Sequence, residues 1–302
     1  MSANPDRRLR IAAIRFLNPA PLMWDFEHPP LNAQLSLRYR IDRMLPSECA
    51  DRLATGDADP RHADIGLVPI AALAQNPALR ILPGCAIASK NRVRSLLLVH
   101  RASQPLRALR SIAADKASLT TLAYARILLN HWGNSNVPFI PASADLDAML
   151  ELADAAILIG DPALLALEEQ ANRFERTREP LVYLDLAHEW HALTGLPFVS
   201  AVWAAAPDNF TDARELNAET WDSIATDFIQ SRIHGLESID ALVAEWSNKL
   251  PIPEETVRTY LTTNVHYVLD EECLEGMRVF FRMAAELSIL PEYAFSVPAL
   301  VV

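Results

Sequence analysis

The chain has 302 residues, of which 51% are apolar and 22% charged, so it is long enough for a large core and has an ordinary globular composition. Its 38 acidic and 27 basic residues give a net charge of -11, which argues against a non-specific nucleic-acid-binding protein but allows a local site for an anion. The cysteines, Cys49, Cys85 and Cys273, are widely spaced, which favours a reducing cytosol over a disulfide framework or a zinc site.

The first ten residues are polar, and no apolar stretch with a small-residue cleavage site follows them. We therefore expect no secretory signal. The sequence also lacks the run of about eighteen apolar residues that a membrane span needs. These features predict a cytoplasmic protein with no membrane partner.

The first third of the chain alternates predicted strands and helices. We expect a first strand that begins near Arg8 and stops at Asn18 and Pro19, because proline cannot donate to a sheet. Asn-Pro is common turn chemistry, but the carboxyl ends of strands are also where α/β sheets bind ligands, so both roles are open for Asn18. We expect further strands over 35–41, 64–69 and 93–99, and a helix over 46–53.

The middle third repeats this alternation, with strands expected over 111–114, 137–140, 155–160 and 198–206 and helices over 118–130 and 146–152. Asp161 and Pro162 predict a helix start, since aspartate caps helices and proline fits their first position. The polar stretch 171–180 predicts a surface loop. From residue 211 onward we expect only helices, including a long amphipathic one over 271–287.

Two α/β parts followed by a helical tail predict a two-lobed, periplasmic-binding-protein-like (type II) clamshell. We assign 1–97 and 201–302 to lobe 1 and 98–200 to lobe 2, and we expect a mainly parallel sheet in each. Crossing segments are expected near 95–102 and 198–205. The ligand cleft would lie between the lobes, where closure can expel water.

Common catalytic motifs are missing, including the nucleophile elbow, the P-loop, the HExxH zinc motif and the dinucleotide fingerprint. His188 and His191 would share one face of a helix and could suit a metal. With no third ligand nearby in the sequence, a polar helix face beside Trp190 is the favoured interpretation.

The segment 115–121 opens a predicted helix with three hydroxyl side chains, those of Ser118, Thr120 and Thr121. Together with the free N–H groups and the positive end of the helix dipole, they could bind a carboxylate or phosphate. For the Ser118 hydroxyl, ordinary N-capping of the helix is an equally good interpretation, but it explains only this one of the three hydroxyls. Ser95 stands at the start of an apolar strand, where serine is usually a tolerated small residue.

Taken together and in order, these segments resemble the chorismate dehydratases, which open the futalosine route to menaquinone. The tail is similar more loosely, through Tyr260-Leu261-Thr262-Thr263. The resemblance rests on Phe16-Leu17-Asn18 with Pro21-Leu22, Asp64 to Pro69, Val93-Arg94-Ser95, Ser118 to Thr121, Leu158 to Asp161 with Ala163-Leu164, and Thr194 to Val199 with Ala201-Val202-Trp203.

The resemblance implies a lyase that needs no cofactor and no metal and that removes water from chorismate to give 3-[(1-carboxyvinyl)oxy]benzoate. It implies Asn18 and Ser95 as the catalytic residues. With the helix-start pattern above, it implies a substrate-binding set of Ser118, Thr120, Thr121, Gly160 and Asp161. The expected partner is the small dicarboxylate chorismate, not nucleic acid, and a homodimer is left open.

The sequence also departs from the family pattern. Leu119 replaces the usual arginine of the Ser-Arg-Thr-Ser motif, Thr121 replaces its last serine, and Ser200 replaces a phenylalanine, while 60–63 looks inserted. Without the arginine, hydroxyl and backbone N–H groups would have to neutralise the substrate carboxylate.

Dehydration of chorismate can proceed with few catalytic side chains, because formation of the aromatic ring supplies driving force. The enzyme must orient the substrate, stabilise charge and exclude water. We expect Asn18 and Ser95 to bind the departing hydroxyl or the ring carboxylate, with the enolpyruvyl carboxylate as a candidate base. The alternatives are a non-catalytic binding protein for a small carboxylate, a ligand-sensing regulator and the dihydroxynaphthoate synthase of the same pathway.

Overall fold

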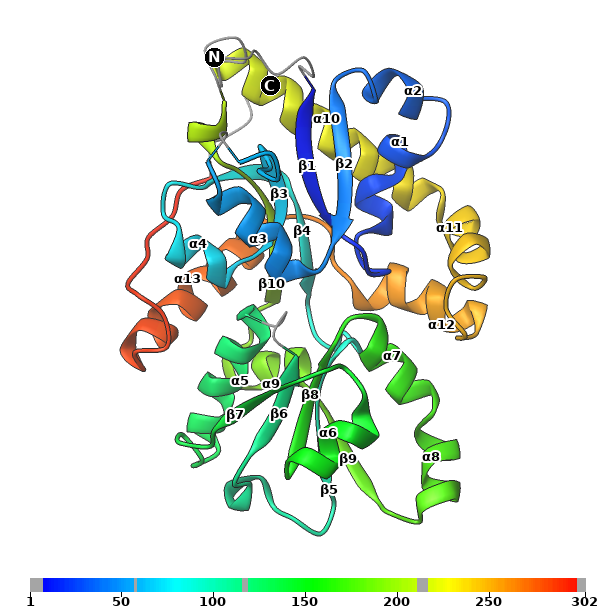
Figure 1. Ribbon diagram of the computed structural model, residues 1–302, viewed down its shortest axis with the longest axis vertical. Coiled ribbons are helices and arrows are strands. Elements are labelled where there is room, and N and C mark those ends of the chain that lie inside the picture. The colour runs from blue at the N-terminus through cyan, green and yellow to red at the C-terminus, as the bar shows by residue number, and fades with distance from the viewer. Residues whose placement is uncertain (1–7, 57–58, 116–118, 211–216, 298–302) are drawn as a thin grey trace.

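The computed structural model describes residues 8–56, 59–115, 119–210 and 217–297, which form two lobes stacked along the long axis (Figure 1). Each lobe is built on one five-stranded sheet. The first sheet has the order β2-β1-β3-β10-β4, with β1 Leu9–Ile14, β2 Tyr39–Met44, β3 Ile65–Pro69, β4 Arg80–Ser89 and β10 Phe198–Ala205. The second has the order β7-β6-β8-β5-β9, with β5 Leu96–Arg101, β6 Ile112–Asp115, β7 Phe139–Ala142, β8 Ala155–Ile159 and β9 Leu181–Asp185.

The two sheets repeat one pattern of strand directions. In the first, β10 runs antiparallel to both of its neighbours, β3 and β4, while β1 pairs in parallel with β2 and β3. In the second, β5 runs antiparallel to β8 and β9, while β6 pairs in parallel with β7 and β8. The sheets are therefore mixed and not mainly parallel as predicted, because the strand that enters each lobe after a crossing runs against its neighbours.

Helices cover both faces of each sheet. Around the first sheet lie η1 Ala20–Met23, α1 Trp24–Glu27, α2 Asn32–Leu35, α3 Pro46–Ala54, α4 Ala71–Gln75, η3 Pro207–Asn209, α10 Ala218–Glu237, α11 Ile239–Trp246, α12 Glu254–Thr259, the π-helix η5 Tyr260–Asn264 and α13 Glu271–Glu286. Around the second lie η2 Leu106–Ala108, α5 Leu119–His131, α6 Leu146–Leu152, α7 Asp161–Glu168, α8 Gln170–Thr177 and α9 Leu186–Thr194.

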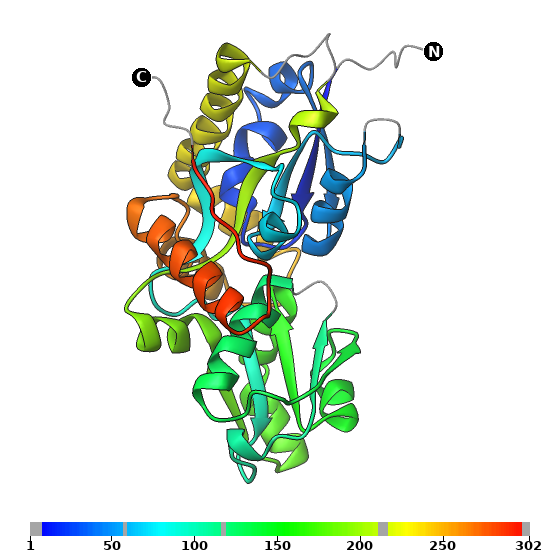
Figure 2. The ribbon, with the colours of Figure 1, turned by 90° about the vertical axis from the view of Figure 1, so that its left-hand side faces the viewer.

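An aromatic cluster joins the lobes on the side where α13 crosses their junction (Figure 2). The ring of Tyr124 on α5 stacks on Phe198 of β10 and on Phe280 of α13, with ring centroids 3.8 and 4.2 Å apart. Trp190 on α9 meets the same tyrosine edge-on. These side chains are fully buried, so α5 and α9 share a core with the helical tail.

Most predicted elements are present, but three differ. The first strand ends at Ile14, not at Asn18, so 15–18 forms the turn that follows it. The second strand is Tyr39–Met44, because Asn32–Leu35 is helical and buries Leu35. The predicted loop 171–180 is largely helix α8, whose Arg173 is buried between Asp147 and Glu179 at 2.7 and 2.9 Å. Paired charges thus stabilise a helix that its polarity alone did not predict.

The division into 1–97 with 201–302 and 98–200 stays a prediction. The strand assignments favour boundaries slightly earlier in the chain, because β5 already begins at Leu96 in the second sheet and β10 begins at Phe198 in the first. None of the helices in the described parts of the chain combines the length and the apolar character that a membrane span requires.

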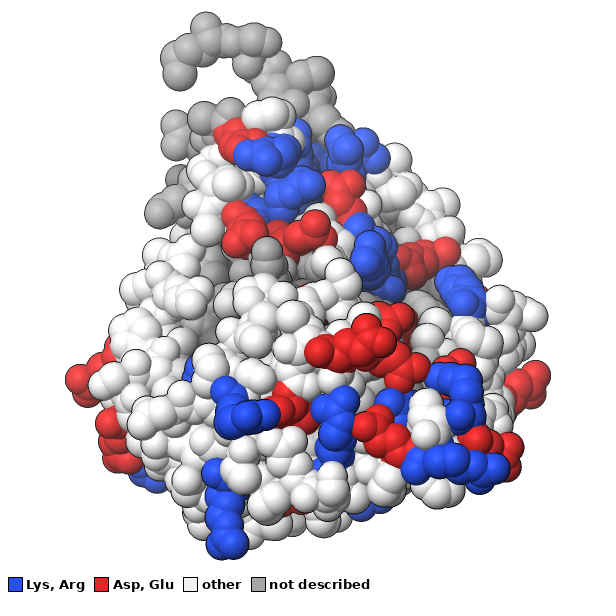
Figure 3. Space-filling view, turned by 60° about the horizontal axis from the view of Figure 1, so that its bottom comes forward, with Lys and Arg blue, Asp and Glu red and all other residues white. Residues whose placement is uncertain are grey.

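Charged side chains of both signs lie side by side on the outer end of the second lobe (Figure 3). Ion pairs in this lobe include Arg101 with Glu179 and Arg176 with Asp147, at 2.7 and 2.8 Å. Positive and negative charges therefore offset each other there, as expected for a solvated surface.

Candidate functional site

A cavity of about 50 Å³ lies between the two sheets, at the ends of β1, β3 and β8. It has room for a few water molecules, so a ring-sized ligand requires the lobes to move apart. Its described lining is uncharged and consists of Ile14, Phe16, Asn18, Pro46, Pro69, Ile87, Val93, Ser95, Leu96, Thr120, Thr121, Ile159, Gly160, Ser200 and Ala201. The structure thus brings five of the predicted site residues together: Asn18, Ser95, Thr120, Thr121 and Gly160.

Asn18 lies in the turn after β1, which places its side chain on the cavity wall. Its Oδ1 atom is buried and has no hydrogen-bond partner among the described residues. A buried acceptor without a partner costs about 1–3 kcal/mol, so such groups are rare unless a ligand or water satisfies them. This oxygen is therefore available to a ligand in the cavity.

The backbone before Ser95 is held in an uncommon conformation. Arg94 has φ = 67°, in the left-handed region that residues other than glycine seldom adopt. The Asp185 carboxylate accepts the N–H groups of Val93 and Arg94 at 3.0 and 2.6 Å with one oxygen, and it caps α9 with the other. Burial raises the pKa of Asp185, although these backbone donors favour its ionised form. The strained turn is thus fixed by one buried carboxylate.

Ser95 itself is buried and held on two sides. Its carbonyl oxygen accepts the N–H of Gly160 at 2.8 Å. Its Oγ lies 2.8 Å from the hydroxyl of Tyr260, the first residue of the π-helix η5. Tyr260 is not among the site residues predicted from the sequence, where the loose motif around it in the tail is the signal that points to it.

Thr120 and Thr121 lie in the first turn of α5, and both are buried. Thr120 Oγ1 accepts the N–H of Ala71, the first residue of α4, at 3.1 Å, which links the two lobes across the cavity. Its own hydroxyl proton stays available to a further acceptor. Ser118 lies outside the described residues, so its predicted role stays a prediction.

Gly160 follows β8 with φ = 64°, and a Cβ there would lie 2.5 Å from Cδ2 of Phe16. The absence of a side chain therefore lets the ring of one lobe approach the backbone of the other. Asp161, in contrast, does not line the cavity: its Oδ1 accepts the N–H of Leu17 at 2.8 Å. Burial raises its pKa to about 6. In this closed arrangement the Asp161 carboxylate links the second lobe to the first through its hydrogen bond with Leu17.

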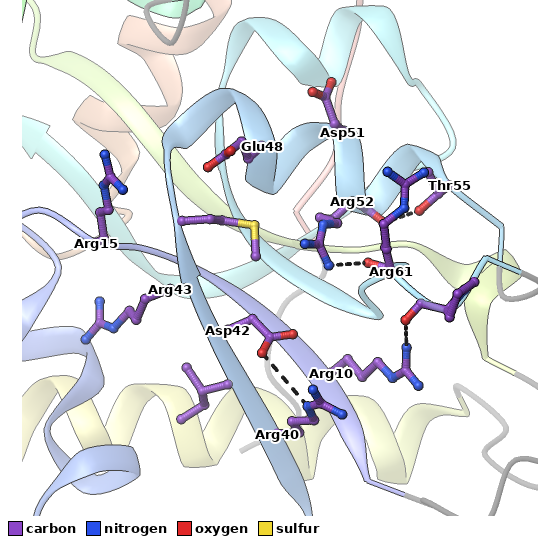
Figure 4. A pocket seen from close by; sticks show the side chains of 13 residues that line it. Arg10, Arg15, Arg40, Asp42, Arg43, Glu48, Asp51, Arg52, Thr55 and Arg61 are labelled. Atoms are coloured by element: carbon purple, nitrogen blue, oxygen red, sulfur yellow. Dashed lines mark hydrogen bonds and ion pairs between the residues drawn. The ribbon is translucent and has the colours of Figure 1, made fainter. Parts of the chain in front are cut away.

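A larger and more open hollow of about 880 Å³ lies beside β1, β2 and α3 and is lined by arginines (Figure 4). Arg10 and Arg52 donate to backbone carbonyl groups, those of Pro60 and Arg61. Arg43 pairs with Glu27, and Arg61 pairs with Asp59, at 2.7 and 2.9 Å. These partners show that these four arginines stabilise local structure.

The two histidines considered for a metal belong to no cluster of three metal-ligating side chains among the described residues. His188 Nδ1 instead lies 2.8 Å from Asn91 Oδ1. The described parts of the chain hold one compact donor group, namely His266, Asp270 and Cys273 within 4.8 Å of one another. There the Lys90 ammonium lies 3.0 Å from Asp270 Oδ2, and the same carboxylate caps α13. The Lys90 ammonium thus already supplies a positive charge beside this donor group.

Two sheets of this topology with a cavity at their strand ends define a two-lobed, periplasmic-binding-protein-like α/β protein. The sequence pattern of the family described as menaquinone biosynthesis matches residues 9–286. The chain belongs to this family. It is 26% identical over 265 residues to the chorismate dehydratase of Thermus thermophilus, a match that covers 83% of this chain and 89% of that protein. The resemblance predicted from the ordered motifs is confirmed.

Solved structures share the fold at low identity. The protein AF1704 from Archaeoglobus fulgidus has a TM-score of 0.69 at 16% identity, covering 95% of this chain and all of that one. The aliphatic sulphonate binding protein SsuA from Escherichia coli has a TM-score of 0.61 at 14% identity, covering 98% of this chain and 94% of that one. These likenesses confirm the predicted clamshell architecture.

Proposed function

We propose that this protein is a lyase that removes water from chorismate to give 3-[(1-carboxyvinyl)oxy]benzoate, in the futalosine route to menaquinone in the cytoplasm. The membership of a menaquinone-biosynthesis family and the dehydratase relative support this choice. The observation that carries it is the chemistry of the cavity: its described lining offers two threonines, two serines and an asparagine but no ionisable side chain.

A reaction that suits such a lining takes its base from the substrate. In the proposed step, the enolpyruvyl carboxylate accepts the C3 proton, the C3–H electron pair forms the new ring double bond, and the C4–O bond breaks. The C4 hydroxyl takes this proton from the enolpyruvyl carboxyl group and leaves as water, and the ring becomes aromatic. The protein is required to orient the reacting groups, to bind the developing charge and to keep the cavity dry.

The side chains on the cavity wall suit these tasks. Ser95 can donate to the departing C4 oxygen, and the unpartnered Oδ1 of Asn18 can accept from a substrate hydroxyl. Thr120 and the first turn of α5 can bind the ring carboxylate, since the helix start favours negative charge. Leu119 is partly buried against the core, so these groups act without the family's arginine.

The test is incubation of the purified protein with chorismate, followed by mass spectrometry. We expect conversion to a product lighter by one water, with the ultraviolet spectrum of a substituted benzoate. Tight binding of chorismate without conversion would favour the binding-protein alternative. If chorismate is neither converted nor bound, the proposal is wrong.

A further inference from the structure

The tail of the chain reaches Ser95 through one buried side chain. Tyr260 is fully buried at the start of η5, directly after α12, and its hydroxyl lies 2.8 Å from Ser95 Oγ. The two residues are 165 positions apart in sequence. Within the described parts of the chain, the hydroxyls of Tyr260 and Ser95 have no hydrogen-bond partner other than each other.

The chain around Tyr260 is fixed in place. The N–H of Val265 donates to the carbonyl oxygen of Tyr260 at 3.0 Å, and this hydrogen bond closes the wide turn of the π-helix. Such turns occur often at functional sites. In α12, Thr256 Oγ1 bonds to Glu168 Oε1 at 3.1 Å, and the same oxygen lies 2.8 Å from Arg94 Nη2. The tail is thereby attached next to the strained turn before Ser95.

Burial also determines the protonation of Tyr260. Desolvation and the nearby carboxylates of Asp161 and Asp185 raise its pKa, so the phenol keeps its proton at physiological pH. A neutral phenol is a good hydrogen-bond donor. When it donates to Ser95 Oγ, the proton of Ser95 is free to point into the cavity.

We propose that Tyr260 is a positioning residue that orients the Ser95 hydroxyl as a donor toward the departing oxygen of the substrate. This inference rests on the proposed function. Tyr260 acts through Ser95, and it does not line the cavity itself.

The test is a double-mutant cycle with Tyr260→Phe and Ser95→Ala. Tyr260→Phe removes only the hydroxyl, and we expect kcat to fall about tenfold with an unchanged KM, the effect of losing one ordinary hydrogen bond. In the Ser95→Ala protein, the same change should alter kcat by less than about twofold, because coupled residues are not additive. Tyr267→Phe is the matched control, since Tyr267 is buried nearby and its hydroxyl lacks a partner among the described residues.

The outcomes separate the two proposals. An unchanged kcat in Tyr260→Phe, or equal losses in the wild-type and Ser95→Ala backgrounds, would overturn the positioning role while the proposed function stands. A wild-type protein that does not dehydrate chorismate would overturn both. A similar loss of kcat in Tyr267→Phe would also overturn the role, because removal of a buried hydroxyl would then suffice.

Discussion

Ser95 and Asn18 lie on the same cavity but are held in opposite ways. Ser95 is fixed by Tyr260 through its side chain and by Gly160 through its backbone, after a turn that Asp185 clamps. Asn18 sits in a turn, and its buried Oδ1 has no described partner. The first residue is organised by the protein before ligand arrives, whereas the second has an unused acceptor that only a ligand or water can satisfy. Preorganised donors suit transition-state stabilisation, and free acceptors suit substrate recognition.

Alanine substitutions should separate these two roles most strongly. We expect Ser95→Ala and Asn18→Ala each to lower turnover on the order of a hundredfold. Ser95→Ala should also lower the free energy of unfolding by about 1–3 kcal/mol, because the buried Tyr260 hydroxyl loses its partner. Asn18→Ala should not lower that free energy, because it removes an acceptor that has no partner among the described residues. Turnover and melting temperature measured on both variants check this, and near-normal turnover in both would remove the site assignment.

The contact between Gly160 and Phe16 predicts the next largest effect. In Gly160→Ala the new methyl group would meet the Phe16 ring and keep the lobes apart, so we expect kcat/KM to fall about tenfold or more. Gly133→Ala is the control, because Gly133 also has a positive φ but no described atom within 4 Å of its Cβ position. Equal effects of the two substitutions would contradict the steric explanation.

Thr120→Val should weaken closure to a smaller degree. The substitution keeps the side-chain volume but leaves the Ala71 N–H without its acceptor, at a cost of about 1–3 kcal/mol in the closed form. We expect KM for chorismate to rise about five- to tenfold, and Thr120→Ser, which keeps the oxygen, to restore it. Steady-state kinetics of the three proteins test this, and an unchanged KM and turnover in the valine variant would exclude the role.

Asp161 predicts a modest pH dependence of stability. Its pKa in the folded protein, about 6, lies above the ordinary value of 3.8, so the folded state binds this proton more readily than the unfolded state does. The contribution of Asp161 to stability should therefore be lost as pH rises through 6 and regained as pH falls from 7 toward 5, by about 1 kcal/mol. Asp161→Asn keeps an acceptor for Leu17 without the charge. The difference in unfolding free energy between the two proteins, followed with pH, should show this trend, and a flat difference would contradict it.

Much of the fold could be predicted from the sequence because the signals are local. Apolar runs such as 155–159 and helix starts such as Pro46 depend on neighbouring residues alone, and both elements lie where expected. The second strand and helix α8 were mispredicted because distant partners decide them: β2 pairs with β1, and Arg173 of α8 is neutralised by Asp147. The local propensities of the sequence carry no information about such distant partners.

The candidate site divides in the same way. Which residue types stand at the strand ends and helix starts is written in the sequence, and the order of its motifs was enough to indicate the family. Which of these residues meet is a property of the folded chain. The fold brings Tyr260 to Ser95 across 165 residues and directs Asp161 to Leu17 instead of the cavity. A hydrogen bond acts over about 3 Å, and the packing of the two lobes and the tail is what brings such distant groups within that reach.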